Sequence, residues 1–268
     1  MEESTAPRLA ISTSKLNLWY GTFQALFDVD LHIRQGIITS MIGPSGCGKS
    51  TFLRSVNRIN ERLGYVRTAG TIRVLGEDML RHRYRVLGRM NYSSPYVDLP
   101  FRLTVWDNLR VYAGLYGLRR PRARIHELAE ELNLGAFLKR GYGSLSAGQK
   151  TRVALAKALL NEPDVLLMDE PTASLDPDMA DYVRNYLKSY QGRTGATLLL
   201  ASHNMTEVER ICDDVVILRE GRRVDQGAPR ELIARYGRQT LEDVFIDIAR
   251  RRHADDEPPP DQQRTASP

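Results

Sequence analysis

Residues 37–56 read IITSMIGPSGCGKSTFLRSV, and the order of features in this stretch decides the fold. An apolar run over 37–42 is followed by a glycine-rich segment and then by a pattern that predicts a helix from Lys49. The segment 43–50 has the spacing GxxxxGKS, in which glycines let backbone N–H groups turn inward and touch phosphate oxygens. The positive end of the helix would point at the same phosphates. A strand, a phosphate-binding loop and a helix in this order indicate an α/β nucleotide-binding core.

Two side chains of this loop have predicted roles in phosphate chemistry. Lys49 would neutralise the β- and γ-phosphates, and the Ser50 hydroxyl would ligate Mg²⁺. Cys47 is either a redox handle or a small residue that the loop tolerates, and we favour the second interpretation.

The rest of the chain alternates short aliphatic runs with amphipathic patterns, which favours a parallel or mixed α/β core. The predicted strands are 9–19, 25–33, 37–42, 71–75, 164–169, 196–201 and 214–219. The predicted helices are 49–59, 104–116, 123–132, 147–160, 178–190, 205–211, 229–235 and 240–251. Residues 85–145 are more helical and are interpreted as an inserted subdomain of a single domain over 1–252. Residues 253–268 are acidic and proline-rich, which predicts a disordered tail.

The 268 residues carry a formal charge of +5 and have a pI near 9.2. The arginines form two local clusters, Arg119, Arg120, Arg122 and Arg124, and Arg250, Arg251 and Arg252. We interpret such clusters as solvated surface rather than as contacts to nucleic acid or to a membrane. No nucleic acid partner is therefore expected.

Several sequence features bear on the compartment. Cys47 and Cys212 are far apart in sequence, which indicates a reducing environment rather than a disulfide framework. The first ten residues lack the basic start and apolar core of a signal peptide. The longest apolar runs fall short of the ~20 residues that span a bilayer. We therefore expect any work at a membrane to depend on another chain.

Acidic side chains follow a predicted buried strand in PDVLLMDEPTASLD, residues 163–176. In an α/β sheet the carboxyl end of a strand is where ligands bind. Asp169 suits a water-mediated contact to Mg²⁺, and Glu170 suits the polarisation of an attacking water. The strand in ATLLLASHN, residues 196–204, delivers His203 to the same edge, which favours a γ-phosphate contact over a structural hydrogen bond.

A second anion site is predicted in YGSLSAGQKTRVALAKALL, residues 142–160. Ser146 and the N–H groups of Ala147 and Gly148 would open a helix there. One chain already has a complete triphosphate cradle, so a second anion site has a use only if two chains face each other. An ordinary helix cap would explain Ser146 but not the full string.

These motifs in this order resemble the ATPase subunit of an ABC transporter, over roughly residues 9–250. The resemblance rests on GPSGCGKST at 43–51, LSAGQ at 145–149, LLMDEP at 166–171, SLD at 174–176 and the histidine of ASHN. It implies a P-loop NTPase core of the ABC-ATPase type, with an N-terminal antiparallel β-subdomain and an inserted helical subdomain. It also implies ATP and Mg²⁺ as cofactors, with Lys49, Glu170 and His203 as catalytic residues.

The resemblance further implies a head-to-tail dimer of this chain that works with separate membrane permease subunits at the cytoplasmic face of the membrane. Ser146, Gly148 and Gln149 would meet the partner's γ-phosphate, and Asp176 would couple the two sites. Tyr20 in NLWYGTFQAL would stack on adenine, with Trp19 as the alternative. The implied ATP contacts of the phosphate loop are Gly43, Pro44, Ser45, Gly46, Cys47, Gly48, Lys49, Ser50 and Thr51.

Three functions remain open at this point. The stretches LTVWDNLRVYAGLYGL, residues 103–118, and TLEDVFIDIARR, residues 240–251, resemble ATPases that power export of drugs, polysaccharides or lipid-linked sugars. The phosphate-loop region is instead similar to phosphate-importer subunits, and it weighs less because ATP constrains it in every subfamily. A soluble ABC protein acting on ribosomes or DNA is the third. We favour export.

The sequence departs from the resemblance in LGRMNYSSPYVDLP, residues 87–100. The family normally has a glutamine there that contacts Mg²⁺ and the attacking water, but this chain has none between Gln35 and Gln149. Tyr92 or Ser93 occupies the place. We predict that Ser93, a candidate metal contact, or Ser94 substitutes for the amide.

The same stretch also carries a prediction about the permease. We expect Tyr96, Val97 and Leu99 to form an apolar wall for a permease helix. The alternative is a plain turn set by Pro95 and Pro100.

Overall fold

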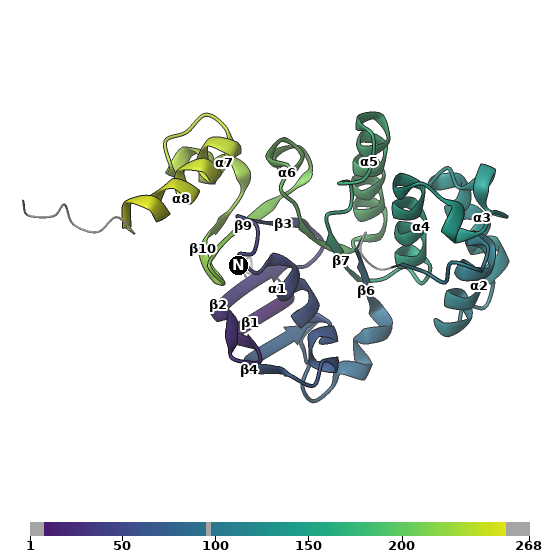
Figure 1. The fold of residues 1–268 in the computed structure, drawn as a ribbon, viewed down its shortest axis with the longest axis horizontal. Helices are drawn as coiled ribbons and strands as arrows, with labels where there is room; N and C mark the ends of the chain where they lie inside the picture. Colours follow the sequence, from purple (N-terminus) through teal and green to yellow (C-terminus); the bar gives the residue numbers. More distant parts are fainter. Residues whose placement is uncertain (1–7, 95–97, 256–268) are drawn as a thin grey trace, which may run out of the picture.

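The computed structural model of the chain describes residues 8–94 and 98–255, and it contains two β-sheets and eight α-helices within them. Figure 1 shows the N-terminal strands below the core sheet, helices α2–α5 to one side and α7–α8 to the other. The α/β class predicted from the sequence is confirmed. Every predicted strand and helix is present, with ends that differ by a few residues.

The first sheet is antiparallel and forms an N-terminal β-subdomain with the strand order β2-β1-β4-β5. Its strands are β1 (Leu9–Tyr20), β2 (Phe23–Arg34), β4 (Val66–Val74) and β5 (Glu77–Asp78). β1 and β2 carry long stretches of alternating buried and exposed side chains, as expected of strands with one face on a core. The two-residue β5 was not predicted.

The second sheet has the order β10-β9-β3-β8-β7-β6 and is parallel except where β10 pairs with β9. Its strands are β3 (Ile38–Ile42), β6 (Met90–Ser93), β7 (Val165–Asp169), β8 (Thr197–Ala201), β9 (Asp214–Arg219) and β10 (Arg222–Gly227). All residues of β3, β7 and β8 are buried, because helices or the other sheet cover both faces. The parallel order brings the ends of β3, β7 and β8 to one edge, where the candidate site forms.

The helices are α1 (Lys49–Val56), α2 (Val105–Leu115), α3 (Pro121–Glu131), α4 (Ala147–Leu159), α5 (Pro177–Thr194), α6 (Met205–Ile211), α7 (Pro229–Arg235) and α8 (Leu241–Asp255). Local sequence explains where several of them begin. Thr104, Ser146, Asp176 and Asn204 each accept a backbone N–H at the start of a helix. Gly195, at φ 68°, ends α5 in the left-handed conformation that glycine adopts without strain.

The core sheet separates two apolar clusters. On one face, α1 packs Phe52, Leu53 and Val56 against side chains of the β-subdomain. On the other face, α4 packs Val153 and Leu155 among side chains of the remaining helices. The helix that follows the phosphate loop and the helix that begins with LSAGQ therefore lie on opposite faces of one sheet.

The structure adds detail at two of the predicted boundaries. β6 pairs with β7 inside the core sheet, so residues 90–93 belong to the core and not to the helical insertion expected over 85–145. α8 continues to Asp255, so the first three residues of the predicted tail are helical. The remainder of that tail, 256–268, lies outside the described residues.

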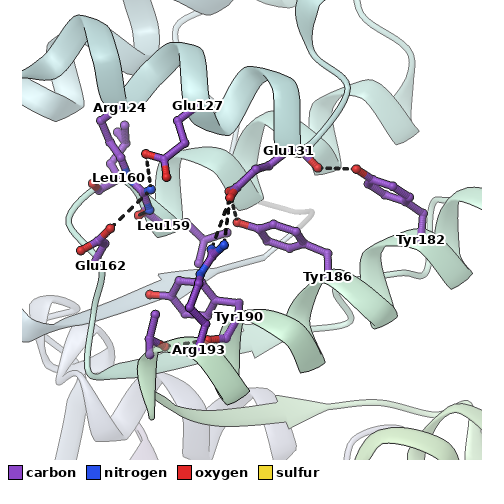
Figure 2. A network of polar contacts seen from close by, with 11 residues as sticks. Arg124, Glu127, Glu131, Leu159, Leu160, Glu162, Tyr182, Tyr186, Tyr190 and Arg193 are labelled. Atoms are coloured by element: carbon purple, nitrogen blue, oxygen red, sulfur yellow. Dashed lines mark hydrogen bonds and ion pairs between the residues drawn. The ribbon is translucent and has the colours of Figure 1, made fainter.

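The helical insertion is joined to the core through the end of α3. Figure 2 shows Glu131 reaching toward Tyr186 and Arg193 of α5. The Tyr186 hydroxyl donates to Glu131 Oε2 at 2.7 Å, and the Tyr182 hydroxyl donates to the Glu131 carbonyl at 2.7 Å. Arg193 adds an ion pair to the carboxylate at 3.3 Å. These contacts fasten α3 to α5 across more than 50 residues of sequence.

Arg124 does not belong to a solvated arginine surface, contrary to the interpretation of its cluster. Its side chain is only 10% exposed, and its guanidinium donates to the carbonyls of Leu159 and Leu160 at the end of α4. Glu127 and Glu162 pair with the same guanidinium. A cation at the C-terminal end of a helix satisfies free carbonyls and opposes the negative end of the helix dipole.

Candidate functional site

Backbone conformation and close packing require glycine at two positions of the phosphate loop, residues 43–48. Gly43 has φ 152° and Gly48 has φ 106°, conformations that L side chains rarely adopt. A Cβ atom at Gly43 would lie 2.1 Å from the carbonyl oxygen of Leu218, and one at Gly48 would lie 2.9 Å from Leu26. Glycine at both positions lets the loop pass close to β9 and β2 while it curls into a cradle.

Lys49 folds back over this cradle. Its ammonium donates to the carbonyls of Gly43 at 2.7 Å and Pro44 at 3.1 Å. It also lies 3.7 Å from the sulfur of Cys47. Burial raises the pKa of the Cys47 thiol, and the nearby Lys49 only partly opposes this. A buried, protonated thiol favours the interpretation of Cys47 as a small residue that the loop tolerates.

Ser50 and Asp169 meet where α1 begins and β7 ends. The Ser50 hydroxyl donates to Asp169 Oδ1 at 2.9 Å, and Asp169 is 2% exposed. A hydroxyl and a carboxylate side by side are oxygen donors of the kind that Mg²⁺ prefers, and Mg²⁺ commonly uses one or two such groups together with phosphates. The two predicted metal contacts therefore lie together and fit that ion.

Glu170 and His203 form a second pair at the same edge. His203 Nδ1 lies 2.8 Å from Glu170 Oε2. Glu170 has φ 51°, unusual for a residue with a side chain, and its N–H donates to the Ala201 carbonyl of β8. Strained backbone of this kind is concentrated at functional sites. It turns the Glu170 carboxylate out of the strand, while the His203 side chain remains 70% exposed.

Tyr20 lies at the outer end of β1, against the helix of the phosphate loop. Its hydroxyl donates to Asn60 Oδ1 at 3.2 Å and lies 3.4 Å from Thr51 Oγ1. The alternative residue, Trp19, lies under the guanidinium of Arg67 at 4.2 Å. The contact to Thr51 places Tyr20, rather than Trp19, beside the loop. Its stacking on adenine remains a prediction.

The LSAGQ segment forms the start of α4. Ser146 and Gln149 make a reciprocal capping box, in which each side chain accepts the other's backbone N–H. A Cβ at Gly148 would lie 3.2 Å from the carbonyl of Ser174, so the segment packs against the SLD turn. Asp176 of that turn accepts the N–H of Met179 and caps α5. The structure thus brings the predicted residues Ser146, Gly148, Gln149 and Asp176 into one corner.

The segment 87–100, which lacks the expected glutamine, does not form the apolar wall in the predicted way. Leu99 is 3% exposed and belongs to the apolar core, so it does not form an outer wall for a permease helix. Tyr96 and Val97 lie outside the described residues. Ser93 pairs with Met168, whose side chain lies in the cluster on the α4 side of the sheet. The metal role of Ser93 remains a prediction.

From this segment, the side chain that reaches Asp169 is that of Tyr92, which was not the predicted substitute for the glutamine. The Tyr92 hydroxyl donates to Asp169 Oδ2 at 3.3 Å. Arg54 Nε donates to the Tyr92 hydroxyl at 3.2 Å, and the same guanidinium lies 3.8 Å from Asp169. Burial raises the pKa of Tyr92, against hydrogen bonds with Arg54 and Ser94. Arg54 carries a signal in the sequence, because residues four apart share one face of a helix and Ser50 is its neighbour.

Glu207 is a second residue that sequence reasoning missed. This buried carboxylate of α6 accepts the Thr172 hydroxyl at 2.8 Å and the Ser202 hydroxyl at 3.5 Å. Thr172 follows Glu170 by two residues, and Ser202 precedes His203. Arg184 of α5 lies 3.7 Å from the same carboxylate. Glu207 therefore ties together the two loops that carry the Glu170–His203 pair.

Comparisons with known proteins show which proteins this chain resembles. The family model described as ABC transporter matches residues 26–173. Nod factor export ATP-binding protein I of Paraburkholderia xenovorans (strain LB400) is 36% identical over 85% of this chain and 74% of its own length. The methionine import ATP-binding protein MetN of Bordetella pertussis is 36% identical over 80% of this chain, which spans 60% of that relative. The phosphate import ATP-binding protein PstB of Oceanobacillus iheyensis is 31% identical over 88% of each chain.

Solved structures share the fold. An ATP-binding subunit of an ABC transporter superposes with a TM-score of 0.78 at 25% identity, covering 90% of this chain and 99% of that one. A dimeric ATP-binding cassette in a post-hydrolysis state with ADP and phosphate has a TM-score of 0.72 at 22% identity, covering 81% and 98%. The β-subdomain, core sheet and helical insertion are thus those of known ATP-binding cassettes.

Proposed function

The chain belongs to the ABC transporter family as one of its ATP-binding and ATP-hydrolysing subunits, and from this premise we propose that it powers export through a separate membrane permease. The observation that carries the proposal is that two pairs of predicted site residues lie at the same edge of the core sheet. Ser50 lies 2.9 Å from Asp169, and Glu170 lies 2.8 Å from His203. Residues 1–252 act as a single ATPase domain in this proposal.

The proposed roles follow from the geometry of these groups. The N–H groups of the loop and the Lys49 ammonium hold the β- and γ-phosphates, with Lys49 leaving its carbonyl partners. Ser50, and Asp169 through water, would hold Mg²⁺, which would supply positive charge near the phosphates. Glu170 accepts a hydrogen bond from the attacking water and polarises it, and His203 contacts the γ-phosphate. Tyr20 stacks on the adenine.

The second half of the site is proposed to come from another copy of this chain. α1 and α4 lie on opposite faces of the core sheet, so LSAGQ is turned away from the phosphate loop of its own chain. In a head-to-tail dimer, Ser146, Gly148 and Gln149 of one copy would close over ATP held by the other. Asp176, beside Gly148, would join the two composite sites.

A mixing experiment tests this arrangement. Lys49→Ala removes the phosphate ligand from one copy, and Ser146→Arg blocks the signature helix of another. Each variant alone is expected to be inactive as an ATPase. In a head-to-tail dimer the mixture contains one composite site with both halves intact, so mixing restores ATP hydrolysis. Failure of the mixture to hydrolyse ATP, with both variants folded and the wild type active, would argue against the shared site.

ABC ATPase subunits work with transmembrane subunits, and no helix within the described part of this chain is long and apolar enough to cross a bilayer. We place the permease contact on the helical insertion, at the cytoplasmic face of the membrane. Phe101, Val111 and Leu115 expose half or more of their side chains there. These apolar groups replace the buried Leu99 in the proposed docking surface.

Export is favoured over import by the segments of α2 and α8 that resemble exporter ATPases. α8 is part of the core, because Leu241, Val244 and Ile248 are buried in it. Import is the second candidate, and the methionine-import and phosphate-import relatives favour it.

Reconstitution tests the direction of transport. The permease is identified by mass spectrometry after purification of the native complex from membranes, and the complex is placed in proteoliposomes with ATP outside. Accumulation of substrate in the lumen supports export, and its loss from the lumen supports import. Purification with ribosomes and without a membrane subunit would contradict a transport role.

A further inference from the structure

Asp169, the carboxylate predicted to contact the metal through water, accepts a hydrogen bond on each of its two oxygens. Its Oδ1 atom accepts the Ser50 hydroxyl at 2.9 Å, and its Oδ2 atom accepts the Tyr92 hydroxyl at 3.3 Å. We propose that Tyr92, supported by Arg54, is a positioning residue that holds Asp169 with Oδ1 toward Ser50 and the metal. This inference rests on the proposed function, because it concerns the Mg²⁺ and ATP site.

The two carboxylate oxygens need different partners for this role. A carboxylate rotates readily about its last side-chain bond, so a donor on one oxygen is needed to orient the other. Asp169 is 2% exposed, so bulk water does not supply that donor freely. The Tyr92 hydroxyl supplies it, and it leaves Oδ1 free to face Ser50 and a water on Mg²⁺.

Arg54 strengthens this arrangement. Its Nε atom donates to the Tyr92 hydroxyl at 3.2 Å, which orients the phenolic proton toward Asp169. A second nitrogen of the same guanidinium lies 3.8 Å from Asp169 Oδ2 and compensates its buried charge. Arg54 and Ser50 share one face of α1, so the helix of the phosphate loop presents both groups to Asp169.

The position of Tyr92 explains why a phenol serves here. β6 pairs with β7 so that Tyr92 lies opposite Leu167, two residues before Asp169. Its ring packs against the apolar cluster on the α1 side, which limits the movement of the hydroxyl. From the other side, Lys157 of α4 lies 3.4 Å from the Tyr92 carbonyl. A phenol at this position therefore reaches Asp169. The residue that follows it is Ser93 and not a glutamine.

Tyr92→Phe tests the proposal, because it removes one hydroxyl and keeps the ring that packs in the core. We expect the Mg²⁺ concentration for half-maximal ATPase activity to rise by about 10-fold or more, as for loss of a group that orients a metal ligand. Mn²⁺ binding in the presence of ATP, followed by electron paramagnetic resonance, should weaken by a similar factor. Binding of a fluorescent ATP analogue in EDTA should not change.

Tyr116→Phe is the matched control, since Tyr116 is a half-buried tyrosine at the C-terminal cap of α2. It should leave the metal requirement at the wild-type value. Arg54→Gln should raise that requirement in the same direction as Tyr92→Phe. Wild-type metal affinity in Tyr92→Phe would overturn the positioning role while leaving the proposed function intact. A wild-type protein without Mg²⁺-dependent ATP hydrolysis would overturn the proposed function and this inference with it.

Discussion

His203 Nδ1 lies 2.8 Å from Glu170 Oε2, although the two residues belong to loops after different strands. Parallel pairing of β7 with β8 brings the loops together, and the N–H of Glu170 donates to the carbonyl of Ala201. The pairing of β7 with β8 thus positions the carboxylate and the imidazole side by side. In the proposed function, Glu170 orients the attacking water and His203 contacts the γ-phosphate.

Glu170→Gln should slow ATP hydrolysis by roughly 10²–10⁴-fold, since the amide cannot polarise water as a carboxylate does. ATP binding should persist, so the variant should accumulate as an ATP-bound dimer. Steady-state turnover and size-exclusion chromatography with and without ATP measure these effects. Glu242→Gln, at an exposed position of α8, is the control. Near-normal turnover of Glu170→Gln would remove Glu170 from the catalytic role.

His203→Ala should lower kcat by about 10- to 100-fold, because it removes a donor to the γ-phosphate where charge develops. KM for ATP should change little, since the loop and Lys49 supply most of the binding. His82→Ala provides a control at a partly exposed histidine that pairs with Glu77. An unchanged kcat would indicate that His203 has a structural role alone.

Lys49→Ala should weaken ATP binding by at least about 10-fold, since a charge-assisted contact to the phosphates is lost. Within the described residues, the ammonium donates to backbone carbonyls and lies near the Cys47 sulfur, so the fold should remain. Fluorescent-nucleotide titration and thermal unfolding measure the two effects, with exposed Lys139→Ala as the control. Equal affinity in both variants would contradict the phosphate role.

Glu207→Gln should lower the free energy of unfolding by about 1–2 kcal/mol, because it weakens hydrogen bonds to a buried charged group. It should also lower kcat, since Thr172 and Ser202 flank the loops of Glu170 and His203. Urea unfolding and steady-state kinetics give both values. Exposed Glu130→Gln should change neither. Wild-type kcat with lowered stability would limit Glu207 to a role in folding.

Tyr186→Phe should cost about 1.5–3 kcal/mol of stability at neutral pH, the value of a hydrogen bond to a charged group. Burial and then Glu131 raise the pKa of Tyr186. An unfolded tyrosine loses its proton near pH 10, so the folded state holds more protons above that pH. The free energy of unfolding therefore falls as pH rises past about 10.

Removal of Tyr186 should make that fall shallower between about pH 10 and 11.5. Urea unfolding at several pH values measures the slope for the wild type and the variant. Tyr84→Phe, at an exposed tyrosine, should leave the slope near that of the wild type. Identical slopes for Tyr186→Phe and the wild type would show that Tyr186 does not contribute to the pH dependence.

Local sequence predicted most of the elements, and it failed where local signals are weak. β6 has only four residues, and β10 is an exposed edge strand of sequence RRVDQG without an apolar pattern. Neither has the periodicity that marks a strand. Leu99 looked like a surface contact because it follows a polar, proline-containing segment, yet the helical insertion folds over it and buries it.

By itself the sequence determined the phosphate loop, the acidic end of β7, the LSAGQ helix start and the α/β order. Each of these depends on neighbouring residues, whose spacing dictates turns, caps and backbone access. Only the tertiary structure decided that Tyr92 reaches Asp169 across 77 residues and that Tyr186 holds Glu131 across 55. Such contacts depend on strand pairing and helix packing, which bring distant side chains together after the chain has folded.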